Sequence, residues 1–174
     1  MPSNVEIKAR VHDLLELKAR AKTLSGDTGT IIEQEDTFFD VPNGRLKLRC
    51  LKGRPSQLIY YERPDASGPK LSNYYIAETN QPKEMVVTLK HALGIKGVVK
   101  KKRVLYLIGQ TRVHVDQVEG LGDFMELEVV LEEGQTTEYG QQIADVLMKK
   151  LGIDKGDLVT GAYMDLILAK NNDQ

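Results

Sequence analysis

Apolar and polar residues alternate one by one over several short stretches of this chain. Residues 5–11, 45–50, 112–116 and 125–131 each have an apolar side chain at every second position and mostly charged side chains between them. Period two places successive side chains on opposite faces of a β-strand. Further strands are expected at residues 30–39, 57–63, 73–78, 97–108 and 163–168. The pattern predicts about eight strands, several of them with one apolar and one charged face.

Three other stretches have helical periodicity. Residues 13–24, 83–93 and 136–151 carry apolar side chains at three- and four-residue spacing. Gly152 follows the third stretch and suits the left-handed residue that ends many helices. Turn-forming residues separate several of the expected strands, and there is no internal repeat. Strands joined by turns, with only three helices among them, predict an antiparallel α+β domain.

Length and composition limit the classes of protein to consider. The 174 residues suit one domain spanning residues 1–174, and the net charge of −1 argues against a nucleic-acid partner. No apolar run is long enough to span a bilayer, and residues 1–4 lack the features of a secretory signal, so no membrane partner is expected. The single cysteine, Cys50, can form no disulfide within the chain. These features favour a cytoplasmic protein.

The charged strand faces divide by sign. Basic residues cluster at Arg45, Lys47 and Arg49 and again at Lys101 and Arg103, whereas Glu126 and Glu128 form an acidic pair. One interpretation is an ordinary sheet with one face in water. The other is a sheet curled into a barrel, whose basic wall needs an anion and whose carboxylates need a cation. A polyphosphate carrying Mg²⁺ or Mn²⁺ satisfies both walls.

An ordered set of motifs resembles the CYTH, or triphosphate tunnel metalloenzyme, family over roughly residues 5–168. Residues 4–8, Asn-Val-Glu-Ile-Lys, resemble its opening motif Glu-x-Glu-x-Lys, with Asn4 in place of the first Glu. Residues 34–40 and 44–49 resemble the second and third strands, and Lys101-Lys102-Arg103 fits a Lys-x-Arg motif. Residues 114–128 fit the strands that hold the metal, and residues 162–166 resemble Ser-Tyr-x-Asp-Leu. The resemblance implies a closed or nearly closed antiparallel β-barrel of about eight strands, with a central tunnel and helices packed outside.

The family's functional residues carry over position by position. The phosphate-binding residues implied are Lys8, Lys47, Arg49, Lys101 and Arg103. The metal ligands implied are Glu6, Asp116, Glu126 and Glu128, for Mg²⁺ or Mn²⁺. The catalytic residues implied are Glu6, Lys8 and Glu128. Lys100 and Lys102 are then expected to point away from the lumen.

Other positions carry less specific expectations. The family commonly has Lys two positions before the proline at 64, where this chain has Glu62 with Arg63 beside it; a carboxylate there is expected to oppose phosphate binding by that strand. His114 is either catalytic or a lumen polar group, and Tyr163 is either functional or core. Asp36 and Asp165 are expected to be structural.

The resemblance implies an enzyme acting on a small-molecule triphosphate. The leading hypothesis is metal-dependent hydrolysis of an inorganic or organic triphosphate, such as tripolyphosphate, a nucleoside triphosphate or thiamine triphosphate. An alternative is adenylyl cyclase chemistry on ATP, although the family's cyclases carry a His-Phe pair before the first motif that is not found upstream of Asn4. A third hypothesis, motivated by Asn4 and Glu62, is a binding module without turnover.

Overall fold

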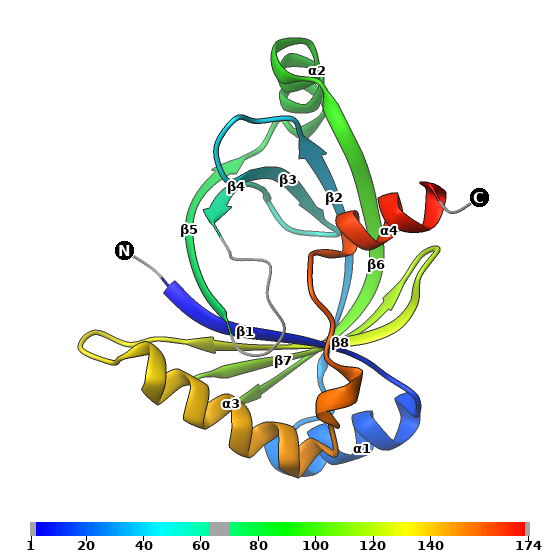
Figure 1. The fold of residues 1–174 in the computed structure, drawn as a ribbon. Coiled ribbons are helices and arrows are strands. Elements are labelled where there is room, and N and C mark those ends of the chain that lie inside the picture. The colour runs from blue at the N-terminus through cyan, green and yellow to red at the C-terminus, as the bar shows by residue number, and fades with distance from the viewer. Residues whose placement is uncertain (1–2, 63–69, 173–174) are drawn as a thin grey trace.

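Eight antiparallel strands form a closed barrel in the computed structural model, which describes residues 3–62 and 70–172 (Figure 1). The strands are β1 (Ser3–Arg10), β2 (Thr30–Phe39), β3 (Arg45–Leu51), β4 (Ser56–Glu62), β5 (Lys70–Thr79), β6 (Ile95–Ile108), β7 (Thr111–Val118) and β8 (Gly122–Val130). Their order around the barrel is β1-β5-β4-β3-β2-β6-β7-β8, and β8 pairs with β1 to close it. Closure leaves no strand edge exposed. The predicted fold class is confirmed; Arg63, the expected end of the fourth strand, lies outside the described residues.

Within residues 3–62 and 70–172, four helices accompany the barrel: α1 (Leu14–Ser25), α2 (Pro82–Leu93), α3 (Thr137–Leu151) and α4 (Tyr163–Asn172). A 3₁₀ turn covers Lys155–Asp157. The first three helices match the helical stretches predicted from the sequence. The side chains of Asp13 and Thr136 cap the N-termini of α1 and α3, and Gly152 ends α3 in the left-handed conformation. None of the helices in the described part of the chain is long and apolar enough to cross a membrane.

The main hydrophobic core lies outside the barrel. Helices α1 and α3 lie together across β1, β6, β7 and β8 (Figure 1), and the apolar faces of these strands pack beneath them. Ile7, Val113 and Leu127 from the strands meet Leu17 and Leu147 from the helices in one buried cluster. Because successive strand residues alternate between faces, burying the apolar face outward turns the charged face into the lumen. This arrangement settles the two interpretations of the charged faces in favour of the barrel.

The segment 163–168 is a helix, so the strand predicted there is wrong. A short run of apolar residues fits either element, and length and capping decide between them. The carboxylate of Asp165 accepts a hydrogen bond from the backbone N–H of Ala162 at 3.0 Å, which caps the start of α4. Tyr163, Leu166 and Ile167, spaced three and four residues apart, then pack on one apolar cluster.

Candidate functional site

The barrel encloses a cavity of about 490 Å³ lined by side chains from all eight strands. Its lumen face has polar or charged residues along most of its length. At one end, Phe38, Tyr61, Val99 and Phe124 pack with Tyr163 at the start of α4 and form an apolar plug. At the other end, where β1 and β2 begin, the lining side chains become partly exposed. The cavity is therefore a tunnel closed at the α4 end.

Basic residues from two strands face Asp36 in the middle of the tunnel. The guanidinium of Arg49 on β3 donates two hydrogen bonds to the Asp36 carboxylate, both at 3.0 Å, and the Lys47 Nζ lies 3.6 Å from Asp36 Oδ2. Burial works to raise the pKa of Asp36, but Arg49, Lys47 and Lys101 outweigh it and hold that pKa well below its usual range. Asp36, expected to be structural, anchors one side of the predicted phosphate clamp.

Two lysines in the tunnel have lowered pKa values, because they are buried and lie near other positive charges. Burial, followed by the charge of Arg49, lowers the pKa of Lys47 to about 7. Burial and the neighbouring Arg103 lower the pKa of Lys101 to about 8. Both shifts arise because like charges and a dry environment disfavour the ammonium form. An anion placed between these side chains would relieve that cost.

Asp116 is completely buried and holds Arg103 in place. The Arg103 guanidinium donates to both carboxylate oxygens at 2.7 and 2.8 Å, and the Tyr163 hydroxyl donates to Oδ2 at 2.7 Å. Burial works to raise the pKa of Asp116, but Arg103 outweighs it and lowers that pKa. With both oxygens engaged, Asp116 is suited to orient Arg103 rather than to receive a metal ion.

Lys8 lies deep in the tunnel, against the segment that precedes α4. Its Nζ donates to the carbonyl of Gly161 at 3.2 Å, lies 3.6 Å from Glu126 Oε1, and sits 4.0 Å from the centroid of the Tyr163 ring. The Lys101 Nζ lies 4.8 Å from the same ring. A cation over an aromatic face is stabilised without neutralising its charge. Tyr163 therefore supports two ammonium groups that point into the tunnel, and its position combines core packing with a place in the site.

The acidic side of the tunnel lies on β1 and β8. Glu6 and Glu128 are directly opposite each other in the strand register. Burial, followed by the charge of Glu6, raises the pKa of Glu128, although Arg112 lies 3.6 Å from its carboxylate. Glu126 behaves differently, because Lys8 and Arg103 outweigh burial and hold its pKa well below the usual range.

The donor set can be compared with the divalent metal that the resemblance implies. Within residues 3–62 and 70–172, no group of three or more His, Cys, Asp or Glu side chains is placed to hold a metal ion. Mg²⁺ commonly takes only one or two carboxylates and completes its shell with water and substrate phosphates. The pair Glu6 and Glu128 fits that demand, and a cation would remove the repulsion by Glu6 that adds to burial in raising the pKa of Glu128.

Among the residues that the structure describes, two that line the lumen have a buried polar atom without a hydrogen-bond partner. His114 Nδ1 and Asn4 Oδ1 are buried and accept or donate no hydrogen bond. Burial, reinforced by Arg103, lowers the pKa of His114 well below its ordinary value, so its imidazole is neutral near pH 7. His114 lies opposite Glu126 in the register and Asn4 opposite Ser72. Both residues line the same cavity as the charged groups.

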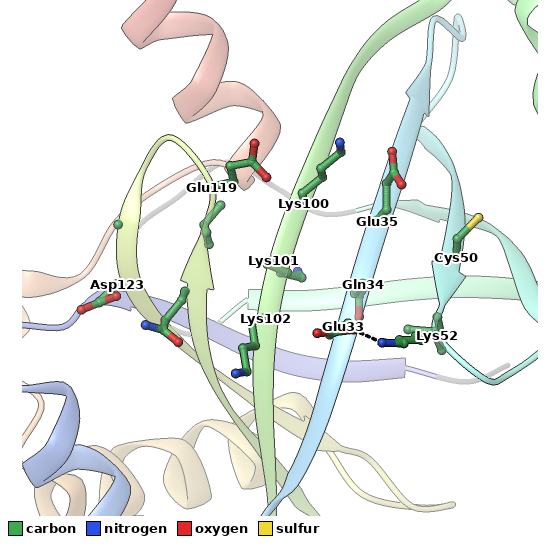
Figure 2. A pocket seen from close by; sticks show the side chains of 14 residues that line it. Glu33, Gln34, Glu35, Cys50, Lys52, Lys100, Lys101, Lys102, Glu119 and Asp123 are labelled. Carbon is green, nitrogen blue, oxygen red and sulfur yellow. Dashed lines mark ion pairs between the residues drawn. The ribbon is translucent and has the colours of Figure 1, made fainter.

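Strand parity places several expected residues outside the tunnel. Figure 2 shows Lys100 and Lys102 projecting from one side of β6, while Lys101 lies behind the strand, as predicted. They border an open depression of about 670 Å³ on the outer barrel surface. Glu62 is also exposed, and its carboxylate accepts a hydrogen bond from Tyr60 at 2.7 Å. The expectation that Glu62 opposes phosphate binding is therefore wrong, because the side chain points away from the lumen.

Sequence patterns identified the charged lumen residues but missed two features of the tunnel. The cation-supporting role of Tyr163 depends on a chain reversal that brings residues 161–163 back to β1. Gln34 donates to Asp36 at 3.0 Å, but an isolated glutamine has no distinctive pattern that predicts this contact. Its position two residues from Asp36 on β2 is the signal that could have found it.

Comparisons with known proteins agree with this geometry. The family model of the CYTH domain matches residues 3–163. This protein belongs to the CYTH family. A relative from Aeromonas hydrophila named adenylate cyclase CyaB is 28% identical over 171 residues, covering 93% of this chain and 87% of its own.

Two solved structures share the CYTH tunnel fold. A protein from Pyrococcus horikoshii OT3 is 27% identical with a TM-score of 0.83, covering 94% of this chain and 99% of its own. A protein from Pyrococcus furiosus is 26% identical with a TM-score of 0.82 over the same shares of the two chains. The resemblance inferred from the motifs is thus confirmed.

Proposed function

We propose that this protein is a metal-dependent phosphohydrolase that binds a triphosphate in the tunnel and releases orthophosphate from it. The observation that supports the proposal is a pair of opposite charge imbalances in one cavity. Burial and nearby cations lower the pKa of Lys47 and Lys101, while burial and Glu6 raise the pKa of Glu128. A triphosphate carrying a divalent cation supplies the missing negative charge to one wall and the missing positive charge to the other.

In this proposal the basic wall holds the phosphates. The residues involved are Lys8, Lys47, Arg49, Lys101 and Arg103. Arg49 and Arg103 are each held by a bidentate carboxylate, Asp36 and Asp116, so their orientation is fixed before substrate arrives. Fixed cations stabilise the charge that develops on a transferred phosphoryl group without reorganising during the reaction.

The acidic wall has two parts in this proposal. Glu6 and Glu128 would hold the Mg²⁺ or Mn²⁺ ion, while Glu126 keeps Lys8 and Arg103 directed into the tunnel. When bound, the ion supplies neutralisation of phosphate charge in a water-poor site. Of the four predicted ligands, Glu6 and Glu128 fit this role best, Glu126 is engaged by cations, and Asp116 acts through Arg103. Lys8 is the cation closest to the plug and contacts the phosphate that penetrates deepest.

A phosphate-release assay tests the proposal. The protein is incubated with Mg²⁺ or Mn²⁺ and ATP, tripolyphosphate or thiamine triphosphate, and orthophosphate is measured. Lys101→Met should reduce kcat/KM by about 100-fold, because one charge-assisted contact to phosphate is worth on the order of 3 kcal/mol. Lys102→Met is the matched control, since the neighbouring lysine points to the outer surface. Equal effects of the two substitutions would contradict the clamp.

Adenylyl cyclase chemistry is the second candidate, supported by the name of the Aeromonas relative. The same clamp could hold ATP while the ribose 3′-hydroxyl attacks the α-phosphorus. Product analysis separates the two reactions. Hydrolysis releases orthophosphate, whereas cyclic AMP with pyrophosphate would overturn the hydrolase proposal.

Binding without turnover is the third candidate, and only Asn4 now supports it. The outward position of Glu62 removes the other reason for it. Calorimetry combined with the release assay tests this candidate. Tight binding of triphosphates with no product, across all three substrates and both metals, would favour it over hydrolysis.

A further inference from the structure

The tunnel mouth has an apolar arc on one side, formed by lumen-facing residues of adjacent strands. Its members are Ile32 on β2, Leu51 on β3, Ile76 on β5 and Leu105 and Leu107 on β6. Gln57 on β4 interrupts the arc. These side chains are half-buried or exposed, with Ile76 at 49% and Leu107 at 59% exposure.

The strand register places members of this arc beside one another. Ile32 lies opposite Arg103 and Gln34 opposite Leu51, so Ile32 is the diagonal neighbour of both Leu105 and Leu51. Diagonal neighbours on one sheet face are about 7–8 Å apart at their Cα atoms, within reach of large side chains. The arc is therefore continuous across three adjacent strands.

Along each of these three strands, the lumen-facing side chains change from apolar at the mouth to polar or charged in the middle of the tunnel. Along β6 the lumen residues run from Leu107 and Leu105 at the mouth to Arg103 and Lys101 in the middle. On β3, Leu51 at the mouth is followed inward by Arg49 and Lys47, and on β2, Ile32 is followed by Gln34 and Asp36. The apolar plug then closes the far end. The tunnel thus has an apolar mouth, a charged middle and a closed base.

The apolar mouth is one-sided. Across from it, β1, β7 and β8 present Asn4, Arg112 and Glu128 to the lumen. Barrel ends are often apolar simply because hydrophobic residues cover much of any protein surface. A general tendency of that kind predicts apolar residues on all the strands, whereas here the apolar side chains that line the cavity lie on β2, β3, β4, β5 and β6 and not on β1, β7 or β8.

We infer that the substrate is a triphosphate ester whose organic group packs on the apolar arc, rather than inorganic tripolyphosphate. This inference rests on the proposed function. The closed base and the buried cations draw the phosphates inward, so whatever is attached to them points toward the mouth. Inorganic tripolyphosphate has no apolar surface and gains nothing from Ile32, Leu51 or Leu105. A ring such as a nucleobase or a thiazole removes those side chains from water.

Equilibrium binding of three probes tests the inference independently of turnover. ATP, thiamine triphosphate and tripolyphosphate are titrated by calorimetry into the protein without a divalent cation, so that metal-dependent hydrolysis does not consume the probes. At least one organic triphosphate should bind about 10-fold or more tightly than tripolyphosphate, because one apolar contact is worth about 10-fold or more in discrimination. Ile32→Ser should lower that ratio about 10-fold.

Ile31→Ser is the matched control, because Ile31 is the same residue type on the same strand but points outward and is 65% exposed. It should leave the ratio at the wild-type value. Leu107→Ser, at a more exposed position, provides a second test if Ile32→Ser does not fold. Tighter binding of tripolyphosphate, or equal ratios in wild type, Ile32→Ser and Leu107→Ser, would overturn the inference.

The outcomes separate this inference from the proposed function. Selective binding of an organic triphosphate without orthophosphate release would sink hydrolysis and leave the mouth assignment supported. Release of orthophosphate from tripolyphosphate in preference to the organic triphosphates would support hydrolysis and overturn the mouth assignment. No binding of any of the three probes would overturn both.

Discussion

Protonation of the tunnel lysines should control the affinity for triphosphate. In the free protein, the pKa of Lys47 is about 7 and that of Lys101 is about 8. A phosphate beside either ammonium group favours its charged form and returns the pKa toward the ordinary value of about 10.4. Since these pKa values rise on binding, the complex takes up protons, and affinity must fall as pH increases above the free-state values.

The size of the effect follows from those two pKa values. Between pH 7 and pH 9 the protonated fraction of Lys47 falls from about one half to about 1%, which weakens binding about 50-fold. Over the same range the protonated fraction of Lys101 falls about 10-fold. If both lysines are charged in the complex, affinity falls on the order of 500-fold.

Calorimetry with tripolyphosphate at several pH values measures this decline, and buffers of different ionisation enthalpy report the protons taken up. At pH 8 the wild type should take up about 1.4 protons, from about 0.9 at Lys47 and about 0.5 at Lys101. Lys47→Arg keeps the charge but cannot lose its proton in this range, so it should take up only about 0.5. Titration of the substrate is common to both proteins and cancels in the comparison.

A flat affinity between pH 7 and pH 9 would refute the reasoning, because it would mean that these lysines are already fully charged in the free tunnel. So would equal proton uptake by wild type and Lys47→Arg. Lys100→Arg, on the outer face of the barrel, should behave as wild type in both measurements and controls for the general effect of the substitution.

Three other predictions concern metal binding, the plug and α4. Glu128→Gln should weaken Mn²⁺ binding in the presence of tripolyphosphate about 10-fold or more, measured by paramagnetic resonance. Asp116→Asn should mainly weaken phosphate affinity. The opposite pattern would contradict the roles proposed for these two residues. Tyr163→Phe keeps the ring beside the lysines and loses the hydrogen bond to Asp116, so it should lower the free energy of unfolding by about 1–2 kcal/mol, with a larger loss in Tyr163→Ala; equal losses would show that the ring contributes nothing. Gly97→Ala should cost about 1–3 kcal/mol and speed amide exchange in α4, because a Cβ at Gly97 meets the Met164 side chain; an unchanged melting temperature would show that the helix adjusts.

Local pattern was enough to predict most of the barrel strands and the charged face of several, but not the direction in which that face points. Alternation in β1, β3 and β8 specified a charged face, and for β1 and β8 burial of the opposite face under α1 and α3 decided its direction. The helix α4 could not be assigned the same way. Its few apolar residues suit a strand or a helix, and the capping contact between Asp165 and Ala162 that favours the helix involves a residue type found in many loops.

The different partners of the charged lumen residues depend on contacts between strands that are distant in the sequence. Glu126, Glu128 and Asp116 look equivalent in the sequence as carboxylates on lumen faces. In the folded chain, Arg103 donates a hydrogen bond to Asp116, Lys8 forms an ion pair with Glu126, and Glu6 lies opposite Glu128 in the strand register. The sequence shows the charge of each residue. Which residue it pairs with depends on the register between neighbouring strands, and the sequence of a single strand does not specify that register.

Asn4 stands where the family motif has a glutamate, and this difference bears on whether the protein can still catalyse a reaction. Its side chain is buried in the lumen with Oδ1 unpartnered, at a position where the family motif has a third carboxylate. A lone structural metal would need that ligand, because an all-protein site depends on ligand number. A metal that arrives with a triphosphate does not, since phosphate oxygens complete its shell. Under the proposed function, the pair Glu6 and Glu128 would suffice for a metal–substrate complex, and loss of the third carboxylate would make metal binding depend on substrate without abolishing the site.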